Sequence, residues 1–144
     1  MQKSIIYFRF SIITLAILVV LLAGCSRSDG LTIDCDVFED NNNQMAEITV
    51  TAGEEFTVSL CKLSNYGYRW SEDAVIDNPA AVQQLSYEYD PGRSPMGGIP
   101  GKDIWVFRAL EPGNAVISLE HTQPSGMNTR GIWAYKLAVV VRPD

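Results

Sequence analysis

The chain has 144 residues, 47% of them hydrophobic, and a formal net charge of −6 at pH 7. It contains no run rich in Lys and Arg, which argues against binding to nucleic acid and against attachment to an anionic membrane by charge. The single histidine, His121, and the three cysteines form neither a metal-ligand cluster nor a nucleophile–base motif. We therefore expect no metal, no cofactor and no catalysis.

The N-terminal segment has the features of an export signal. Lys3 and Arg9 precede an apolar run from Ile12 to Ala23, shorter than the roughly 18 residues of a membrane-spanning helix. The run ends at Leu22-Ala23-Gly24-Cys25, which resembles the lipobox of prokaryotic lipoproteins. This resemblance implies cleavage before Cys25 and lipidation of that cysteine. The alternative is an ordinary signal peptide or an uncleaved anchor, with Cys25 incidental.

These features predict three regions: a signal peptide at 1–24, a polar tether at 25–30 and one domain at 31–144. The protein would be exported and held at the cell envelope, at the inner or the outer membrane, by its N-terminal lipid only. A mature chain of 120 residues is long enough for a single domain with its own core. We expect it to be a monomer, and more acidic than the whole chain because Lys3 and Arg9 are removed.

Two cysteines, Cys35 and Cys61, belong to the domain. An exported compartment permits a disulfide between them. Alternation points Cys35 inward, on the face of Leu31 and Ile33, whereas Cys61 is out of phase with Leu60 at the end of its strand. A disulfide and two separate thiols therefore both remain possible.

Alternating apolar residues predict short strands throughout the domain. The predicted strands span 31–38, 48–50, 56–60, 68–71, 84–89, 104–110, 115–120 and 133–141. Ala52-Gly53-Glu54 predicts a hairpin between the second and third of these strands. A helical turn is expected only at Asp77–Val82, with Asp77 or Asn78 as its cap and Pro79 at its first position. Such a pattern is typical of an all-β sandwich of about seven strands.

Three loops separate these strands: Lys62–Gly67, Asp90–Lys102 and Thr122–Gly131. Loops longer than about 12 residues without regular structure are frequently functional. The aromatic residues that flank the loops are expected to pack in the core, and they are Tyr68, Trp70, Trp105, Phe107 and Trp133.

The order of motifs around these loops resembles that of the chagasin family of cysteine-peptidase inhibitors, over about residues 46–141. Gly67-Tyr68-Arg69-Trp70 closes the first loop, and Gly98-Ile99-Pro100-Gly101 leads into the aromatic strand Trp105–Leu110. A strand after a Pro-Gly turn then leads to the third loop, Leu119–Ser125. The resemblance implies an immunoglobulin-like sandwich whose three loops, at one end, enter the cleft of papain-like cysteine peptidases.

The resemblance assigns peptidase binding to one group of residues in each loop. These are Leu63, Ser64, Asn65, Tyr66 and Gly67 in the first, Gly98, Ile99, Pro100 and Gly101 in the second, and Gln123, Pro124 and Ser125 in the third. The first loop would cover the catalytic cysteine of the peptidase, and the other two would lie on either side of it.

Two of the loops depart from the family pattern. The first usually has Asn-Pro-Thr-Thr before its glycine, where this chain has Leu63-Ser64-Asn65-Tyr66. The third usually has Arg-Pro-Trp, where this chain has Gln123-Pro124-Ser125. Tyr66 is therefore the candidate anchor, and we expect weaker or redirected inhibition. The alternative function is a lipid-anchored, immunoglobulin-like binding or envelope-interaction module that inhibits no peptidase.

Overall fold

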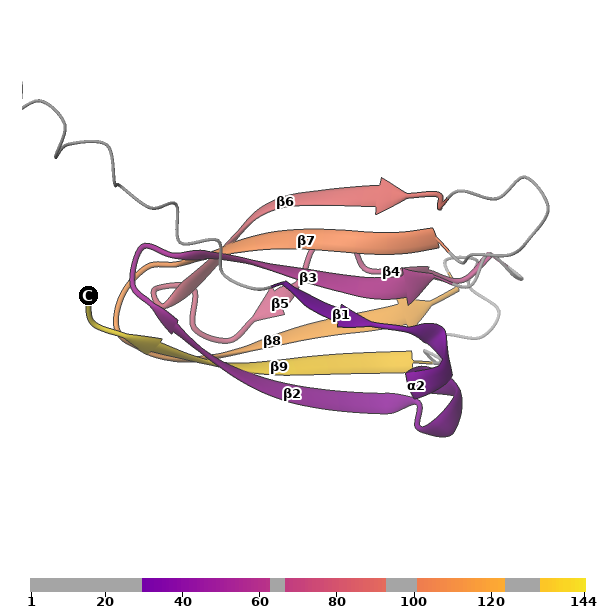
Figure 1. The fold of residues 1–144 in the computed structure, drawn as a ribbon, viewed down its shortest axis with the longest axis horizontal. Coiled ribbons are helices and arrows are strands. Elements are labelled where there is room, and N and C mark those ends of the chain that lie inside the picture. Colours follow the sequence, from indigo (N-terminus) through magenta and orange to yellow (C-terminus); the bar gives the residue numbers. More distant parts are fainter. Residues whose placement is uncertain (1–29, 63–66, 93–100, 124–132) are drawn as a thin grey trace, which may run out of the picture.

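The computed structural model describes residues 30–62, 67–92, 101–123 and 133–144 (Figure 1). Two sheets pack face to face, one with strand order β1-β3-β7-β6 and the other with order β2-β9-β8-β4, in which β5 also pairs with β8. The elements are β1 (Leu31–Ile33), α2 (Cys35–Asp40), β2 (Asn43–Thr51), β3 (Glu55–Lys62), β4 (Arg69–Trp70), β5 (Val75–Ile76), β6 (Val82–Asp90), β7 (Gly101–Ala109), β8 (Gly113–Thr122) and β9 (Trp133–Arg142). The all-β sandwich expected from the sequence is confirmed, and the described residues form nine strands, three of them only two or three residues long.

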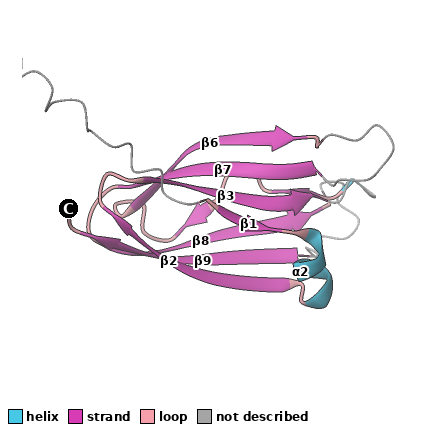
Figure 2. Cartoon of the chain, viewed as in Figure 1, coloured by secondary structure: helices cyan, strands magenta, loops and turns pink. Residues whose placement is uncertain are grey.

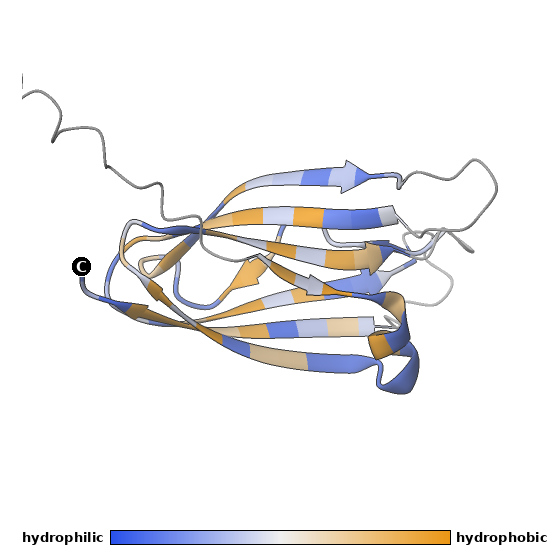
Figure 3. Cartoon of the chain, viewed as in Figure 1, coloured by the Kyte–Doolittle hydropathy of each residue, from blue (hydrophilic) through white to orange (hydrophobic). Residues whose placement is uncertain are grey.

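The core lies between the two sheets and is built by the alternation of side chains along the long strands. Buried positions alternate with half-buried or exposed ones almost without interruption along β7, β8 and β9, because successive side chains of a strand point to opposite faces. Figure 3 shows the same alternation as bands of apolar and polar residues. The largest fully buried apolar side chains are Phe38, Phe56, Leu60, Trp70, Trp105, Phe107, Ile117, Leu119, Tyr135 and Leu137.

The prediction of a strand over Leu31–Phe38 was wrong beyond Ile33. Strand β1 ends there, and the described residues contain one helix, α2, which follows at once (Figure 2). Cys35 and Phe38 are one helical turn apart, and Phe38 is completely buried. A six-residue helix has little stability of its own. Its contacts with the sandwich therefore stabilise the helical conformation, although the alternation of apolar residues favours a strand.

The helical turn predicted at Asp77–Val82 is present as a single turn with Asn78 at its cap position, and it does not continue into a helix. The Asn78 carbonyl accepts hydrogen bonds from the amides of Ala81 (3.1 Å) and Val82 (3.3 Å). Val82 is already the first residue of β6 and pairs with Ala109, so pairing with β7 ends the turn.

The hairpin predicted at Ala52–Glu54 was also wrong, because β2 and β3 lie in different sheets. Strand β2 runs parallel to β9, and β3 runs antiparallel to β7. The turn itself is present: the Glu54 amide donates to the Thr51 carbonyl at 3.0 Å, and Gly53 has φ +90°. It therefore carries the chain from one sheet across to the other.

Candidate functional site

The three loops leave the sandwich at the same end, which we call the loop end. The first loop joins Lys62 of β3 to Gly67, and the second joins β6 to Gly101 of β7. Lys62 and Gly101 are direct partners in the register of β3 and β7. The first two loops therefore start side by side in one sheet.

The third loop starts in the other sheet, opposite these two. It joins β8 to β9, whose last described pair at this end is His121 with Trp133. Strand β4, which follows the first loop, pairs Arg69 with Thr122 beside it. Figure 1 shows all of these strand ends, and α2 with them, at one end of the molecule.

Most of the peptidase-binding residues expected from the sequence lie outside the described residues. They are Leu63, Ser64, Asn65, Tyr66, Gly98, Ile99, Pro100, Pro124 and Ser125, together with the lipidation site Cys25. The structure describes the other three, Gly67, Gly101 and Gln123. Gly67 is exposed with φ +73°, a left-handed conformation that favours glycine, and Gln123 is half-buried directly after β8.

Gly101 is buried at the start of β7, where β6 lies close against it. A Cβ atom at this position would lie 2.8 Å from the carbonyl oxygen of Asp90 and 2.9 Å from the ring and hydroxyl of Tyr89. Both distances are shorter than van der Waals contact. Gly101 thus leaves the space that Asp90 and Tyr89 of β6 occupy at the root of the second loop.

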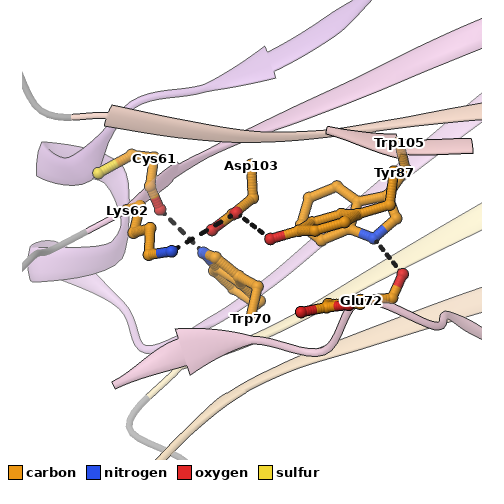
Figure 4. Close-up of polar contacts among 7 residues, drawn as sticks. All are labelled: Cys61, Lys62, Trp70, Glu72, Tyr87, Asp103 and Trp105. Carbon is orange, nitrogen blue, oxygen red and sulfur yellow. Dashed lines mark hydrogen bonds and ion pairs between the residues drawn. The ribbon is translucent and has the colours of Figure 1, made fainter. Parts of the chain in front are cut away.

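Trp70 connects the two sheets beneath the first loop. Its side chain is 1% exposed, and its indole Nε1 donates a hydrogen bond to the Cys61 carbonyl at 2.8 Å (Figure 4). Trp105 meets Trp70 edge-on and donates from Nε1 to the Glu72 carbonyl at 3.0 Å. Trp70 is thus the core residue that the sequence predicts, whereas Tyr68 is half-buried and stacks on His121.

Helix α2 closes the loop end of the core through Phe38. The Phe38 ring lies 4.9 Å from that of Trp133 and 5.3 Å from that of Trp70, measured between centroids. Cys35, at the start of the helix, forms a disulfide with Cys61 of β3, with 5.2 Å between their Cα atoms. Cys61 lies on the opposite strand face from Leu60 and is nevertheless 2% exposed. The disulfide is one of the two alternatives that the sequence left open, whereas sequence reasoning missed the helix, whose only signal was the spacing of Cys35 and Phe38.

Among the described residues of the loop end, two polar side chains are completely buried, Asp103 and His121. Burial raises the pKa of Asp103. It lowers the pKa of His121 to about 4, with a further contribution from the charge of Lys62. Neither ring nitrogen of His121 has a hydrogen-bond partner among the described residues, and its ring lies between those of Tyr68, Trp70 and Trp133.

A shallow groove of about 440 Å³ runs along β4 beside the loop end. It is lined by Arg69, Trp70, Ser71, Glu72, Asp73 and Thr122. Its lining carries both signs of charge and one aromatic residue, Trp70.

The described part of the chain contains no group of three His, Cys, Asp or Glu side chains that could hold a metal ion. Within the same residues, no helix is long and apolar enough to cross a membrane. The fold and the loop roots together define an all-β sandwich with three loops that emerge from one end.

The family to which this chain belongs is shown by its sequence. The model of the chagasin family of peptidase inhibitors (I42) matches residues 49–139, and the chain belongs to that family. The matched range agrees with the one over which the motifs around the loops show the resemblance. No curated protein sequence matches the chain.

Solved structures share the fold. The cysteine protease inhibitor EhICP2 from Entamoeba histolytica superposes with a TM-score of 0.58 and 15% sequence identity, over 78% of this chain and 96% of that one. Amebosin superposes with a TM-score of 0.55 and 24% identity, over 79% of this chain and 99% of that one. The architecture is thus the immunoglobulin-like sandwich of these proteins, and the superposed part of this chain corresponds to nearly the whole of each.

Proposed function

We propose that this protein is a reversible inhibitor of papain-like cysteine peptidases, which it binds with the three loops of its loop end. The observation that carries the proposal is the convergence of the three loop roots at one end of a sandwich whose family consists of peptidase inhibitors. The first loop would cover the catalytic cysteine, and the second and third would lie along either side of the cleft.

The sandwich suits this role because it holds the loop roots rigidly. Ordering mobile loops on binding reduces affinity, and a scaffold that orders them beforehand avoids that loss. Trp70 and the disulfide Cys35–Cys61 both act on the strand that leads into the first loop. A standard interface buries about 800 Å² on each partner and draws most of its energy from a few Trp, Tyr and Arg side chains.

Tyr66 is the proposed anchor of the first loop, and Gly98–Gly101 would bring main chain close to the peptidase in the second. Ser125 is too small to replace a tryptophan, so we expect weaker or redirected inhibition. This altered third loop is the observation that favours the second candidate, a binding module on the same scaffold that inhibits no peptidase.

The decisive experiment is titration of several papain-like peptidases with the segment from Ser26 to Asp144. We expect residual activity to fall to zero, and mass spectrometry to find the inhibitor uncut after incubation. Tyr66→Ala should raise the inhibition constant, whereas Glu55→Gln, at the opposite end of β3, should not change it. Full residual activity at tens of micromolar with every enzyme would exclude inhibition and leave the second candidate.

We further propose that the protein is exported and attached to the cell envelope by lipid on Cys25. Two or three acyl chains would hold it firmly, since each buried CH₂ contributes about 0.8 kcal/mol. The mass of the membrane-extracted protein should exceed that of the chain beginning at Cys25 by the mass of the lipid, and Cys25→Ala should abolish the difference. An unmodified Cys25 in the membrane form would contradict lipidation.

A further inference from the structure

Asp103 interrupts an apolar strand face at the loop end. It belongs to the inward face of β7, which continues with Trp105, Phe107 and Ala109, and its side chain is completely buried. Tyr87 of β6 donates a hydrogen bond of 2.5 Å to its Oδ1. Its Oδ2 has no hydrogen-bond partner within the described residues. A buried carboxylate is costly unless a cation and hydrogen bonds compensate for it.

Lys62 supplies the cation. Its Nζ lies 3.8 Å from Asp103 Oδ1 and 4.0 Å from the centroid of the Tyr89 ring. Figure 4 shows its ammonium group and the Tyr87 hydroxyl on either side of the Asp103 carboxylate. The Lys62 side chain is only 20% exposed, so solvent screens these interactions less than those of a surface ion pair.

Lys62 and Tyr89 lie at the roots of two different loops. Lys62 is the last residue of β3 before the first loop, and Tyr89 is next to the last residue of β6, before the second. The charge of Lys62 also contributes to the low pKa of His121, which lies at the root of the third loop. One ammonium group thus interacts with side chains at the roots of the two other loops.

The same pair of strands carries a second ion pair for comparison. Glu55 and Arg108 join β3 to β7 at the end remote from the loops. Both side chains are 47% exposed, and such surface pairs contribute little to stability. The pair of Lys62 and Asp103 differs from the pair of Glu55 and Arg108 in two ways: its side chains are largely buried, and its lysine also contacts Tyr89 at the root of another loop.

We propose that Lys62 is a positioning residue for peptidase inhibition: its contacts with Asp103 and Tyr89 tie the root of the first loop to that of the second. The part of this inference that concerns inhibition rests on the proposed function. Without the contacts, the root of the first loop is held by the pairing of β3 with β7 and by the contacts of Cys61, but no contact of the Lys62 side chain joins it to the root of the second. More of the ordering of the first loop then has to occur when the peptidase binds. That ordering lowers affinity.

Peptidase binding by the full chain, purified in detergent micelles, tests the proposal. Lys62→Gln removes the charge, and we expect the dissociation constant to rise on the order of tenfold. Lys62→Arg keeps a cation at the same place and should retain most of the affinity. Glu55→Gln, which removes the remote pair, is the matched control and should bind as the wild type does.

Lys62→Gln leaves Asp103 buried without its counter-charge and lowers stability by itself. The double variant Lys62→Gln with Asp103→Asn removes both charges at nearly constant volume, so that no uncompensated charge is left buried. We expect this variant to fold and to show the same loss of affinity as the single variant. Wild-type affinity in the folded double variant would overturn the proposal.

Amide hydrogen exchange on the free protein tests the coupling without any peptidase. In Lys62→Gln, the amides of Lys62, Gly67, Asp90 and Gly92 should lose more protection than those in the middle of β8 and β9, which report only the general loss of stability. Equal acceleration throughout both sheets would mean a general loss of stability and would overturn the proposal, as would no acceleration. If the wild type inhibits no peptidase, the proposed function fails, and this exchange experiment alone decides whether Lys62 couples the loop roots.

Discussion

The ring of Phe38 stacks on the ring of Trp133, with 4.9 Å between centroids and 18° between planes. This contact joins the short helix α2 to the first residue of β9, at the root of the third loop. A helix outside both sheets thereby becomes part of the core, and it closes the end of the sandwich from which the loops emerge.

Phe38→Ala should destabilise the protein by about 3–5 kcal/mol, because it leaves a cavity between Trp70 and Trp133. Urea unfolding measures the change. Val37→Ala, on the exposed side of the same helix, should cost about 0.5 kcal/mol or less. Equal effects of the two substitutions would show that α2 contributes little to the core.

Replacing both Cys35 and Cys61 with alanine should lower the free energy of unfolding by about 3–4 kcal/mol, because the disulfide closes a loop with a sequence separation of 26. The loss should be seen in denaturant unfolding without reductant. Adding reductant to the wild type should reproduce the loss and leave the variant unchanged. Unfolding of the wild type that does not respond to reductant would contradict a stabilising role for the disulfide.

His121 should make the protein less stable as the pH is lowered. Its pKa is about 4 in the folded chain and about 6.5 when unfolded, so the unfolded chain binds the proton more readily throughout this interval. Stability is therefore lost as the pH falls from about 6.5 to about 4, by about 3 kcal/mol in all, and below about pH 4 this contribution stays constant.

His121→Phe keeps an aromatic ring beside Trp70 and Trp133 and removes the titrating group. The difference in unfolding free energy between variant and wild type should grow in favour of the variant as the pH is lowered from 7 to 4. Unfolding in urea at several pH values measures this difference. The titration of the Asp and Glu side chains is the same in both proteins and therefore cancels. Parallel pH profiles would show that His121 does not titrate in this interval.

Gly101→Ala should destabilise the protein by about 1–3 kcal/mol, because its Cβ would overlap the Asp90 carbonyl and the Tyr89 ring. It should also weaken inhibition, since β6 and β7 have to separate at the root of the second loop. Thermal unfolding and peptidase titration measure the two effects. Gly30→Ala, whose Cβ would lie 3.4 Å from its nearest neighbour, is the control and should change neither.

The candidate site was predictable where it depends on local motifs. The Gly-aromatic-x-Trp motif at Gly67–Trp70 and the glycines before Trp105 indicated the first two loops, and the strand after the Pro-Gly turn indicated the third. The strand registers place the roots of all three at one end. The supporting contacts were not predictable in the same way. Lys62 and Asp103 are 41 positions apart and show no pattern along the chain, and only the pairing of β3 with β7 brings them together.

The sequence by itself determined the stretches that form strands, because the alternation of side chains between two faces is a local property of the backbone. It also determined the family, through residues that flank the loops. Only the tertiary structure decided which strands share a sheet, because backbone hydrogen bonds between strands are the same for any sequence. For this reason β2 pairs with β9 and not with β3, although a turn joins β2 to β3. The tertiary structure also decided the conformation of Cys35–Asp40, where burial of Phe38 and the disulfide outweigh the alternation that favours a strand.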